Sequence, residues 1–303
     1  MPVRDGRGVW IAAAGAVLLA GVIGWRTVSA ARHDLHPARR RLTEQDRAAA
    51  LRSLPGLQEV ELRTDDGLLL RGWFAPGRDR SAVVLVHGLG ANRAELLPEA
   101  ALLLRRGHGV LLLDSRNSGE SEGDISTWGD QERRDVAAAL RWLRVHPGVD
   151  PSRVGLYGFS VGASTVAMVA AVDPGVRAVA LGPVWPSLRA ELGHRYSLLH
   201  GRSAALAVLT FRLSGVDVDA IRPVDVVARI SPRPMLFLSG TRDEDTPFAM
   251  EDALAARVPG AVRRRMEGAG HGGFSQVDPK GLDAALGEFF DGALSTLARP
   301  PSQ

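Results

Sequence analysis

A serine flanked by two glycines is the strongest candidate for chemistry in this chain. The run Gly-Phe-Ser-Val-Gly lies at 158 to 162, between an apolar segment at 153 to 157 that predicts a buried strand and a small-residue segment that predicts a helix. On such a sharp turn the serine projects from the backbone, and the two glycines avoid a clash between strand and helix. The positive end of the helix would also face an anionic intermediate. The run predicts that Ser160 is a nucleophile, but five residues alone have low specificity.

A serine nucleophile needs a base, because a hydroxyl group is almost un-ionised at neutral pH. His271, in Gly-Ala-Gly-His-Gly-Gly after the last predicted strand, is the best candidate. The base needs a carboxylate to fix its tautomer, and Asp243 lies just past a strand end, with Asp245 in reserve. Taken singly, a histidine in a glycine loop is by default structural or solvated, and an acidic loop is usually a solvated turn. The order Ser160, Asp243, His271 is nevertheless that of nucleophile, acid and base in one fold class.

The loop after the third predicted strand is the candidate oxyanion hole. It contains the run His-Gly-Leu-Gly at 87 to 90, whose glycines permit close backbone approach. We expect the N–H groups of Leu89 and Val161 to stabilise a developing oxyanion, by about 3 to 4 kcal/mol per donor. The alternative of a phosphate-binding loop is weak, because Arg93 stands where a dinucleotide fingerprint has its third glycine.

The elements that must position these residues alternate regularly along the chain. A hairpin is predicted at 57 to 63 and 68 to 74, and a short helical cap at about 186 to 230. Further strands are expected at 82 to 86, 110 to 113, 153 to 157, 176 to 181, 235 to 238 and 262 to 266, with helices at about 93 to 106, 129 to 145, 161 to 172, 248 to 257 and 279 to 297. This pattern predicts an α/β fold with a doubly wound, mostly parallel sheet and active residues at the carboxyl ends of its strands.

Composition and charge restrict the classes of partner. The chain has no cysteine, which excludes disulfides, thiolate metal sites and a cysteine nucleophile, and the motifs call for no cofactor or metal. Residues 1 to 41 hold seven arginines and two aspartates, a net charge of +5, which leaves −2 for residues 42 to 303 out of a total of +3. A mildly acidic body argues against a nucleic-acid partner.

The N-terminal segment is long and apolar enough to be a membrane anchor. Residues 9 to 25 are 17 residues without a charge, about 25 Å as a helix, with Trp10 and Trp25 at the two expected interfaces. We expect a transmembrane anchor at 1 to 30, followed by a basic linker at 31 to 56. The alternative is a cleaved signal peptide of a secreted protein, since Val-Ser-Ala at 28 to 30 resembles a cleavage site. Downstream arginines favour a cytoplasmic catalytic domain, and the opposite orientation stays open.

Together these motifs resemble those of the α/β-hydrolase superfamily. The resemblance covers residues 57 to 297, which leaves a tail at 298 to 303, and includes the loop at 114 to 121 in addition to the four motifs above. Asn117 replaces a glycine common in the family, a mild departure because asparagine tolerates left-handed geometry. In the family the acid lies three residues after the glycine and four before the proline of its loop, which selects Asp243 over Asp245. The hairpin and short cap are similar to those of single-domain esterases and serine-aminopeptidase-like members.

The resemblance implies a serine hydrolase that acts on a small acyl substrate, with ester hydrolysis the first expectation. A serine aminopeptidase or a thioesterase would use the same triad. A substrate amine would need acidic groups, for which the cap offers Glu191, Asp217 and Asp219, although we expect each of these three to lie on the solvated surface. The apolar segment 204 to 213 is expected to pack over the sheet; its alternative is an acyl-binding or membrane-facing lid for a hydrophobic ester. The alternative from another class is a non-catalytic binding protein tethered to the membrane.

Overall fold

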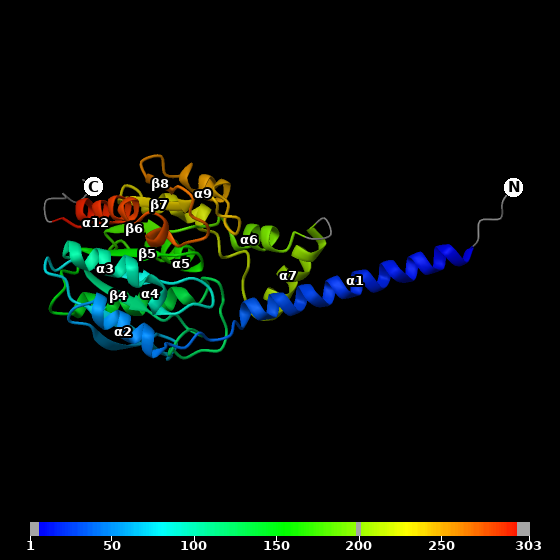
Figure 1. Cartoon of the computed structure of the whole chain (residues 1–303), viewed down its shortest axis with the longest axis horizontal. Helices are drawn as coiled ribbons and strands as arrows, with labels where there is room; N and C mark the ends of the chain where they lie inside the picture. The colour runs from blue at the N-terminus through cyan, green and yellow to red at the C-terminus, as the bar shows by residue number, and fades with distance from the viewer. Residues whose placement is uncertain (1–5, 198–200, 296–303) are drawn as a thin grey trace.

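The computed structural model of the chain describes residues 6–197 and 201–295. A rounded α/β body carries the N-terminal helix, which extends far away from it (Figure 1). Residues 1–5 of the expected anchor, the expected tail at 298–303 and the end of the expected last helix lie outside the described residues.

A single sheet organises the described part of the body. Its strand order is β1-β2-β4-β3-β5-β6-β7-β8. The strands are β1 (Gln58–Arg63), β2 (Leu69–Ala75), β3 (Ala82–Val86), β4 (Gly109–Leu113), β5 (Val154–Gly158), β6 (Ala178–Leu181), β7 (Met235–Gly240) and β8 (Val262–Met266). β2 runs antiparallel to β1 and β4, whereas all other neighbours are parallel. The predicted α/β fold with a mostly parallel sheet is therefore confirmed.

Helices cover both faces of this sheet, which explains why its central strands are apolar throughout. In β3, Val84 and Val86 pack into the core on one face, while Val83 and Leu85 pack into the core on the other. The helices are α2 (Glu44–Ser53), α3 (Leu97–Arg106), α4 (Glu132–Val145), α5 (Val161–Ala170), α6 (Leu188–Arg195), α7 (Arg202–Leu213), α8 (Pro223–Val226), α9 (Phe248–Ala255), α10 (Phe274–Val277), α11 (Pro279–Leu282) and α12 (Glu288–Ala293). α4, α5 and α9 contribute to the first core, whereas α2, α3 and α12 contribute to the second.

Two expected helices differ from the structure in extent. Trp128 and Gly129 have φ values of 57° and 105°, so α4 begins at Glu132 and not at 129. The helix expected at 279 to 297 is divided into α11, a π-helical turn and α12, and glycines at 281, 287 and 292 weaken its continuity.

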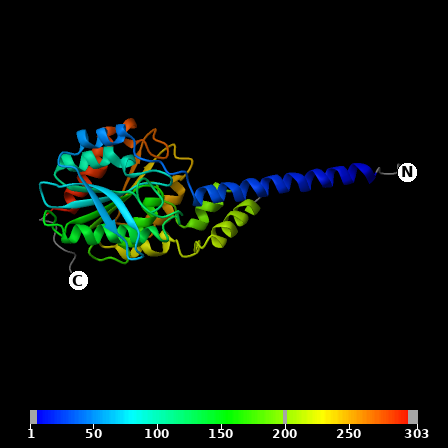
Figure 2. The ribbon, with the colours of Figure 1, turned by 90° about the horizontal axis from the view of Figure 1, so that it is seen from below.

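The N-terminal helix α1 (Gly6–Leu35) continues past residue 30 and ends inside the body. Its stretch Ala14–Leu35 is long and apolar enough to cross a bilayer, with mean hydropathy 1.4. Ala31 and Leu35 are fully buried in a third core that the cap helices α6 and α7 complete, and α7 lies beside α1 (Figures 1 and 2). The range 31–56, expected as a linker, thus holds the last turn of α1 and the helix α2.

Candidate active site

Ser160 lies at the carboxyl end of β5, in the sharp turn that precedes α5. Its φ and ψ of 55° and −119° are unusual for a residue with a side chain, and the two flanking glycines make this turn possible. A Cβ at Gly158 would lie 2.3 Å from the Gly162 carbonyl oxygen, and a Cβ at Gly162 would lie 2.2 Å from the Val86 carbonyl oxygen. Both positions therefore require glycine.

The three residues predicted as a triad form one hydrogen-bonded chain. Ser160 Oγ lies 3.0 Å from His271 Nε2, and His271 Nδ1 lies 2.9 Å from Asp243 Oδ2. An ionised carboxylate only accepts hydrogen bonds, so Nδ1 carries the ring proton and Nε2 is free to accept the serine proton. The other Asp243 oxygen accepts the Thr246 N–H at 2.8 Å, which fixes the carboxylate plane.

The loop after β7 supplies two acids that differ in role. The Asp243 side chain is fully buried and hydrogen-bonded to His271, whereas Asp245 is exposed and lines the cavity above it. Ligand atoms of these three residues lie within 4.8 Å of one another. Because Nδ1 is already bonded to Asp243, we interpret the group as an acid–base pair with a neighbouring charge.

The surroundings of His271 favour its protonated form. Burial alone would lower the imidazole pKa, but the hydrogen bond and the charge of Asp243 raise it above its ordinary value of 6.5. The charges of Asp245 and Glu191 act in the same direction. Such an environment stabilises the imidazolium that forms when the ring accepts a proton from serine.

His87 orients the candidate oxyanion loop. Its Nε2 accepts the Ser115 N–H at 3.2 Å, so its Nδ1 carries the proton and donates to the Gly88 carbonyl at 2.7 Å. In a trans peptide the C=O and N–H point in opposite directions, so this bond also fixes the direction of the Leu89 N–H. Leu89 and Val161 both line the cavity that contains Ser160. The structural role of His87 could not be derived from the motif.

A buried ion pair holds the start of the next helix beside this loop. Arg93 and Asp114 are both fully buried, with 2.6 Å between Arg93 Nη1 and Asp114 Oδ2 and 2.6 Å between the Arg93 N–H and Asp114 Oδ1. The guanidinium also bonds Glu120 at 2.6 Å and lies 4.7 Å from the centre of the Trp73 ring. Arg93 is therefore committed to the fold, which gives no support to the phosphate-loop alternative.

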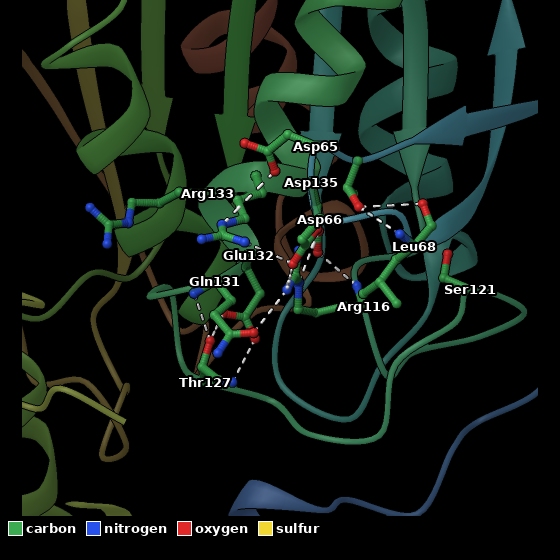
Figure 3. A network of polar contacts seen from close by, with 12 residues as sticks. Asp65, Asp66, Leu68, Arg116, Ser121, Thr127, Gln131, Glu132, Arg133 and Asp135 are labelled. Atoms are coloured by element: carbon green, nitrogen blue, oxygen red, sulfur yellow. Dashed lines mark hydrogen bonds and ion pairs between the residues drawn. The ribbon is translucent and has the colours of Figure 1, made fainter. Parts of the chain in front are cut away.

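The segment that follows β4 is fixed by a second polar network, which Figure 3 shows. Arg116 donates to Asp135 on α4 at 2.7 Å and to Asp66 in the β1–β2 turn at 2.9 Å. Glu132 accepts the Thr127 N–H and hydroxyl at 2.7 and 2.6 Å. The hydrogen bond from Arg116 holds the pKa of Asp66 below its usual range. These contacts hold the loop that ends at Trp128, another residue of the cavity wall.

The cavity over Ser160 has a volume of about 240 Å³ and an acidic lining. Glu95, Glu191 and Asp245 line it together with one arginine, Arg195. Asp219, another cap carboxylate, pairs with Arg189 at 2.7 Å on the exposed surface, as expected. The expectation of a solvated surface position was wrong for Glu191, which is buried by the packing of the cap and lines the cavity.

The end of α1 is attached to this cavity wall. Asp34, 5% exposed, accepts two hydrogen bonds from Arg195 at 2.7 and 3.0 Å and one from the Tyr196 hydroxyl at 2.5 Å. Its carbonyl accepts the Trp128 indole N–H at 3.1 Å. The N-terminal helix therefore positions two side chains of the cavity, a link that no sequence motif indicated.

Comparison with known proteins identifies the family. Residues 37–210 match the family model described as X-Pro dipeptidyl-peptidase (S15 family), and residues 208–293 match the model of TAP-like proteins. The Pyrococcus furiosus esterase Pf2001 has the same fold, with a TM-score of 0.70 and 23% identity over 86% of this chain and 98% of that one. The chain belongs to the α/β-hydrolase superfamily.

The relatives found by sequence similarity are named for different activities, or for none. Thiohydrolase aneE of Aspergillus aculeatus is 40% identical over 125 residues, which cover 40% of this chain and 39% of that protein. The polyketide transferase ATR5 of Stachybotrys chlorohalonatus is 38% identical over 40% of this chain and 42% of its own length. The uncharacterized protein Rv2307c of Mycobacterium tuberculosis is 30% identical over 77% of each chain. The chain thus spans about two fifths of the length of the first curated relatives that it matches.

Proposed function

We propose that this protein is a serine hydrolase that cleaves an ester through a covalent acyl-enzyme. Ser160 Oγ attacks the carbonyl carbon while His271 Nε2 takes the hydroxyl proton. The imidazolium then gives this proton to the leaving alkoxide, and the carbon–oxygen bond to the alcohol breaks. Water attacks the acyl-enzyme with His271 again as base, which releases the carboxylic acid and restores the serine. Asp243 holds the imidazole in the required tautomer throughout.

The hydrogen-bonded chain from Ser160 through His271 to Asp243 is the observation that carries this proposal. Two further features support it. Ser160 lies at the N-terminal end of α5, where helix N–H groups favour negative charge, and the N–H groups of Leu89 and Val161 are the proposed oxyanion donors. Each such donor contributes on the order of 3 kcal/mol to transition-state stabilisation in comparable sites.

Hydrolysis of a graded set of acyl substrates tests the proposal. We expect the purified protein to release 4-nitrophenol from short 4-nitrophenyl esters, and we expect Ser160→Ala to reduce kcat to the background rate. Ser164→Ala, which changes a buried serine one turn along α5, is the matched control and should retain the activity. Equal rates for wild type and Ser160→Ala would contradict the proposal, as would the absence of turnover with every ester, thioester and amide.

Thioesters are the second substrate class to be tested, because relatives named thiohydrolases are 37% and 40% identical over about two fifths of the chain. The same triad would cleave a thioester by the same steps, with a thiolate as the leaving group. A higher kcat/KM for a thioester than for the ester of the same acyl group would assign the protein to that class. The reverse order would support the ester.

We propose in addition that α1 anchors the protein in a membrane. Its apolar stretch is 22 residues long, and only 11% of the 18-residue segment that defines this stretch is buried. Trp10 and Trp25 are 78% and 72% exposed. We expect the intact N-terminus in the membrane fraction of cells that express the full chain. A mature chain that begins at Ala31 would identify a cleaved signal peptide.

A membrane-tethered binding protein without activity is the alternative from another class. On a hydrolase fold such a protein usually lacks one triad residue. Here serine, histidine and aspartate are all present and hydrogen-bonded, so we favour the enzyme.

A further inference from the structure

Glu191 is a buried acid that the proposed triad does not use. It lies in the first turn of α6, is 5% exposed, and lines the same cavity as Ser160 and His271. Its Oε2 is buried and has no hydrogen-bond partner among the described residues. A buried carboxylate oxygen without a partner destabilises a fold, so a donor from outside the chain would remove this penalty.

The neighbouring cation does not satisfy this carboxylate. Arg195 is on the same helix and lines the same cavity, but its guanidinium makes two hydrogen bonds to Asp34 at 2.7 and 3.0 Å. Burial raises the pKa of Glu191 to about 7, although the charges of Arg195, His194 and His271 act in the opposite direction. A cation brought into the cavity would therefore favour the ionised form of Glu191.

Apart from Arg195 and His271, the charged groups in the cavity lining have the same sign as Glu191. Glu95 lines it and accepts the Gly88 N–H at 2.8 Å, and Asp245 lies at its exposed edge. Phe159 and Trp128 also line the cavity, and the Arg195 guanidinium lies 5.6 Å from the centre of the Trp128 ring. Among the described lining residues, three carboxylates outnumber the paired Arg195 and His271, which makes the cavity suited to a positively charged group.

We propose that Glu191 binds a protonated amine of the substrate while Ser160 attacks its acyl group. The inference rests on the proposed hydrolase function and specifies its substrate class: an acyl compound with an ammonium group within reach of α6. The amine belongs either to the acyl part or to the leaving group, and both positions use the same ion pair with Glu191. Such a charge-assisted hydrogen bond changes binding by about tenfold to a hundredfold.

Two pairs of substrates test this inference. In the first pair the 4-nitrophenyl ester of 2-aminopentanoic acid is compared with that of 2-methylpentanoic acid, in which a methyl group replaces the ammonium. In the second pair the amine lies on the alcohol, and 2-aminoethyl butyrate is compared with propyl butyrate. For wild type we expect kcat/KM to be at least about tenfold higher for the amine in one of the two pairs. The pair that shows the preference identifies the position of the amine.

Glu191→Gln keeps the shape of the side chain and removes its charge. We expect this variant to lose the preference for the amine by about tenfold to a hundredfold while hydrolysis of the neutral ester changes much less. A role of Glu191 in folding, or in raising the pKa of His271, would change both members of a pair equally. Glu288→Gln, on the exposed side of α12, is the matched control and should keep the wild-type preference.

Equal kcat/KM within both pairs for wild type would overturn the inference and leave the proposed hydrolase function intact. The same holds if Glu191→Gln retains the full preference for the amine. If wild type hydrolyses none of the four esters and Ser160→Ala is indistinguishable from it, the hydrolase function fails and the inference fails with it.

Discussion

Replacing Asp243 with asparagine should abolish most of the activity without unfolding the protein. In the structure each carboxylate oxygen has its own donor: His271 Nδ1 at 2.9 Å and the Thr246 N–H at 2.8 Å. Asparagine has one acceptor oxygen, and if this accepts the backbone N–H, its NH₂ faces Nδ1. The imidazole must then carry its proton on Nε2, toward Ser160, where it is unable to act as a base. A triad with this tautomer loses about 10⁴-fold in kcat, or about 5 kcal/mol of transition-state stabilisation.

The assay is kcat for a 4-nitrophenyl ester, measured together with the melting temperature of each variant. Asp245→Asn is the matched control, because this exposed acid contributes charge near His271 but the Nδ1 hydrogen bond goes to Asp243. We expect it to lose less than about tenfold in kcat, since it acts through a screened charge. The assignment of the acid is refuted if Asp243→Asn retains more than about a tenth of the wild-type kcat, or if Asp245→Asn has the larger effect.

Three further predictions concern the turn, the base and the N-terminal helix. Gly162→Ala should destabilise the fold by about 3 kcal/mol, seen as a lower melting temperature, because its Cβ would lie 2.2 Å from a backbone oxygen of β3; an unchanged melting temperature would contradict this. The midpoint of the rising limb of kcat/KM with pH should lie above pH 6.5, because His271 must be neutral to act as a base and its pKa is raised. Asp245→Asn should move this midpoint to lower pH. A midpoint below 6.5 in the wild type would be inconsistent with this prediction. Asp34→Asn should lower the free energy of unfolding by about 1 to 3 kcal/mol. It should also raise KM more than it lowers kcat, because it releases Arg195 in the cavity wall. An unchanged KM would argue against this link.

Matched controls exist for two of these variants. Gly292→Ala is the control for Gly162→Ala. Gly292 lies in α12, and a Cβ at this position would have no neighbouring atom within 4 Å, so the variant should leave the free energy of unfolding unchanged or raise it by less than about 1 kcal/mol. Asp219→Asn breaks an exposed ion pair of the cap that solvent screens, so its melting temperature should stay close to that of the wild type.

Much of the fold and of the candidate site was predictable, because the motifs that carry them are local. The apolar strands alternate with helices at spacings that define a parallel sheet. The carboxyl ends of such strands meet at one edge of the sheet, so the loops after β3, β5, β7 and β8, which hold residues 87 to 90, 160, 243 and 271, come together there. Asn117, expected to tolerate left-handed geometry, has a φ of 58°. Each of these predictions depends on a few consecutive residues.

The contacts that no motif indicated join residues far apart in the chain. Arg93 and Asp114 are 21 residues apart, and Asp34 and Arg195 are 161 apart, so their pairing depends on how helices pack and not on local spacing. Trp128 was not predicted as a cavity residue, because it precedes the expected helix and no motif indicated its left-handed turn. The cap followed no periodic pattern, and only its packed structure places Glu191 in the cavity and Asp219 on the surface.

The central claim is that Ser160 is a nucleophile activated by His271. Incubation with a fluorophosphonate followed by peptide mapping measures this directly, since the reagent phosphonylates an activated serine and releases fluoride. We predict one adduct per chain, on Ser160, absent from Ser160→Ala and strongly slowed in His271→Ala. An unlabelled wild-type protein, or labelling of Ser160→Ala at the wild-type rate, would contradict the claim.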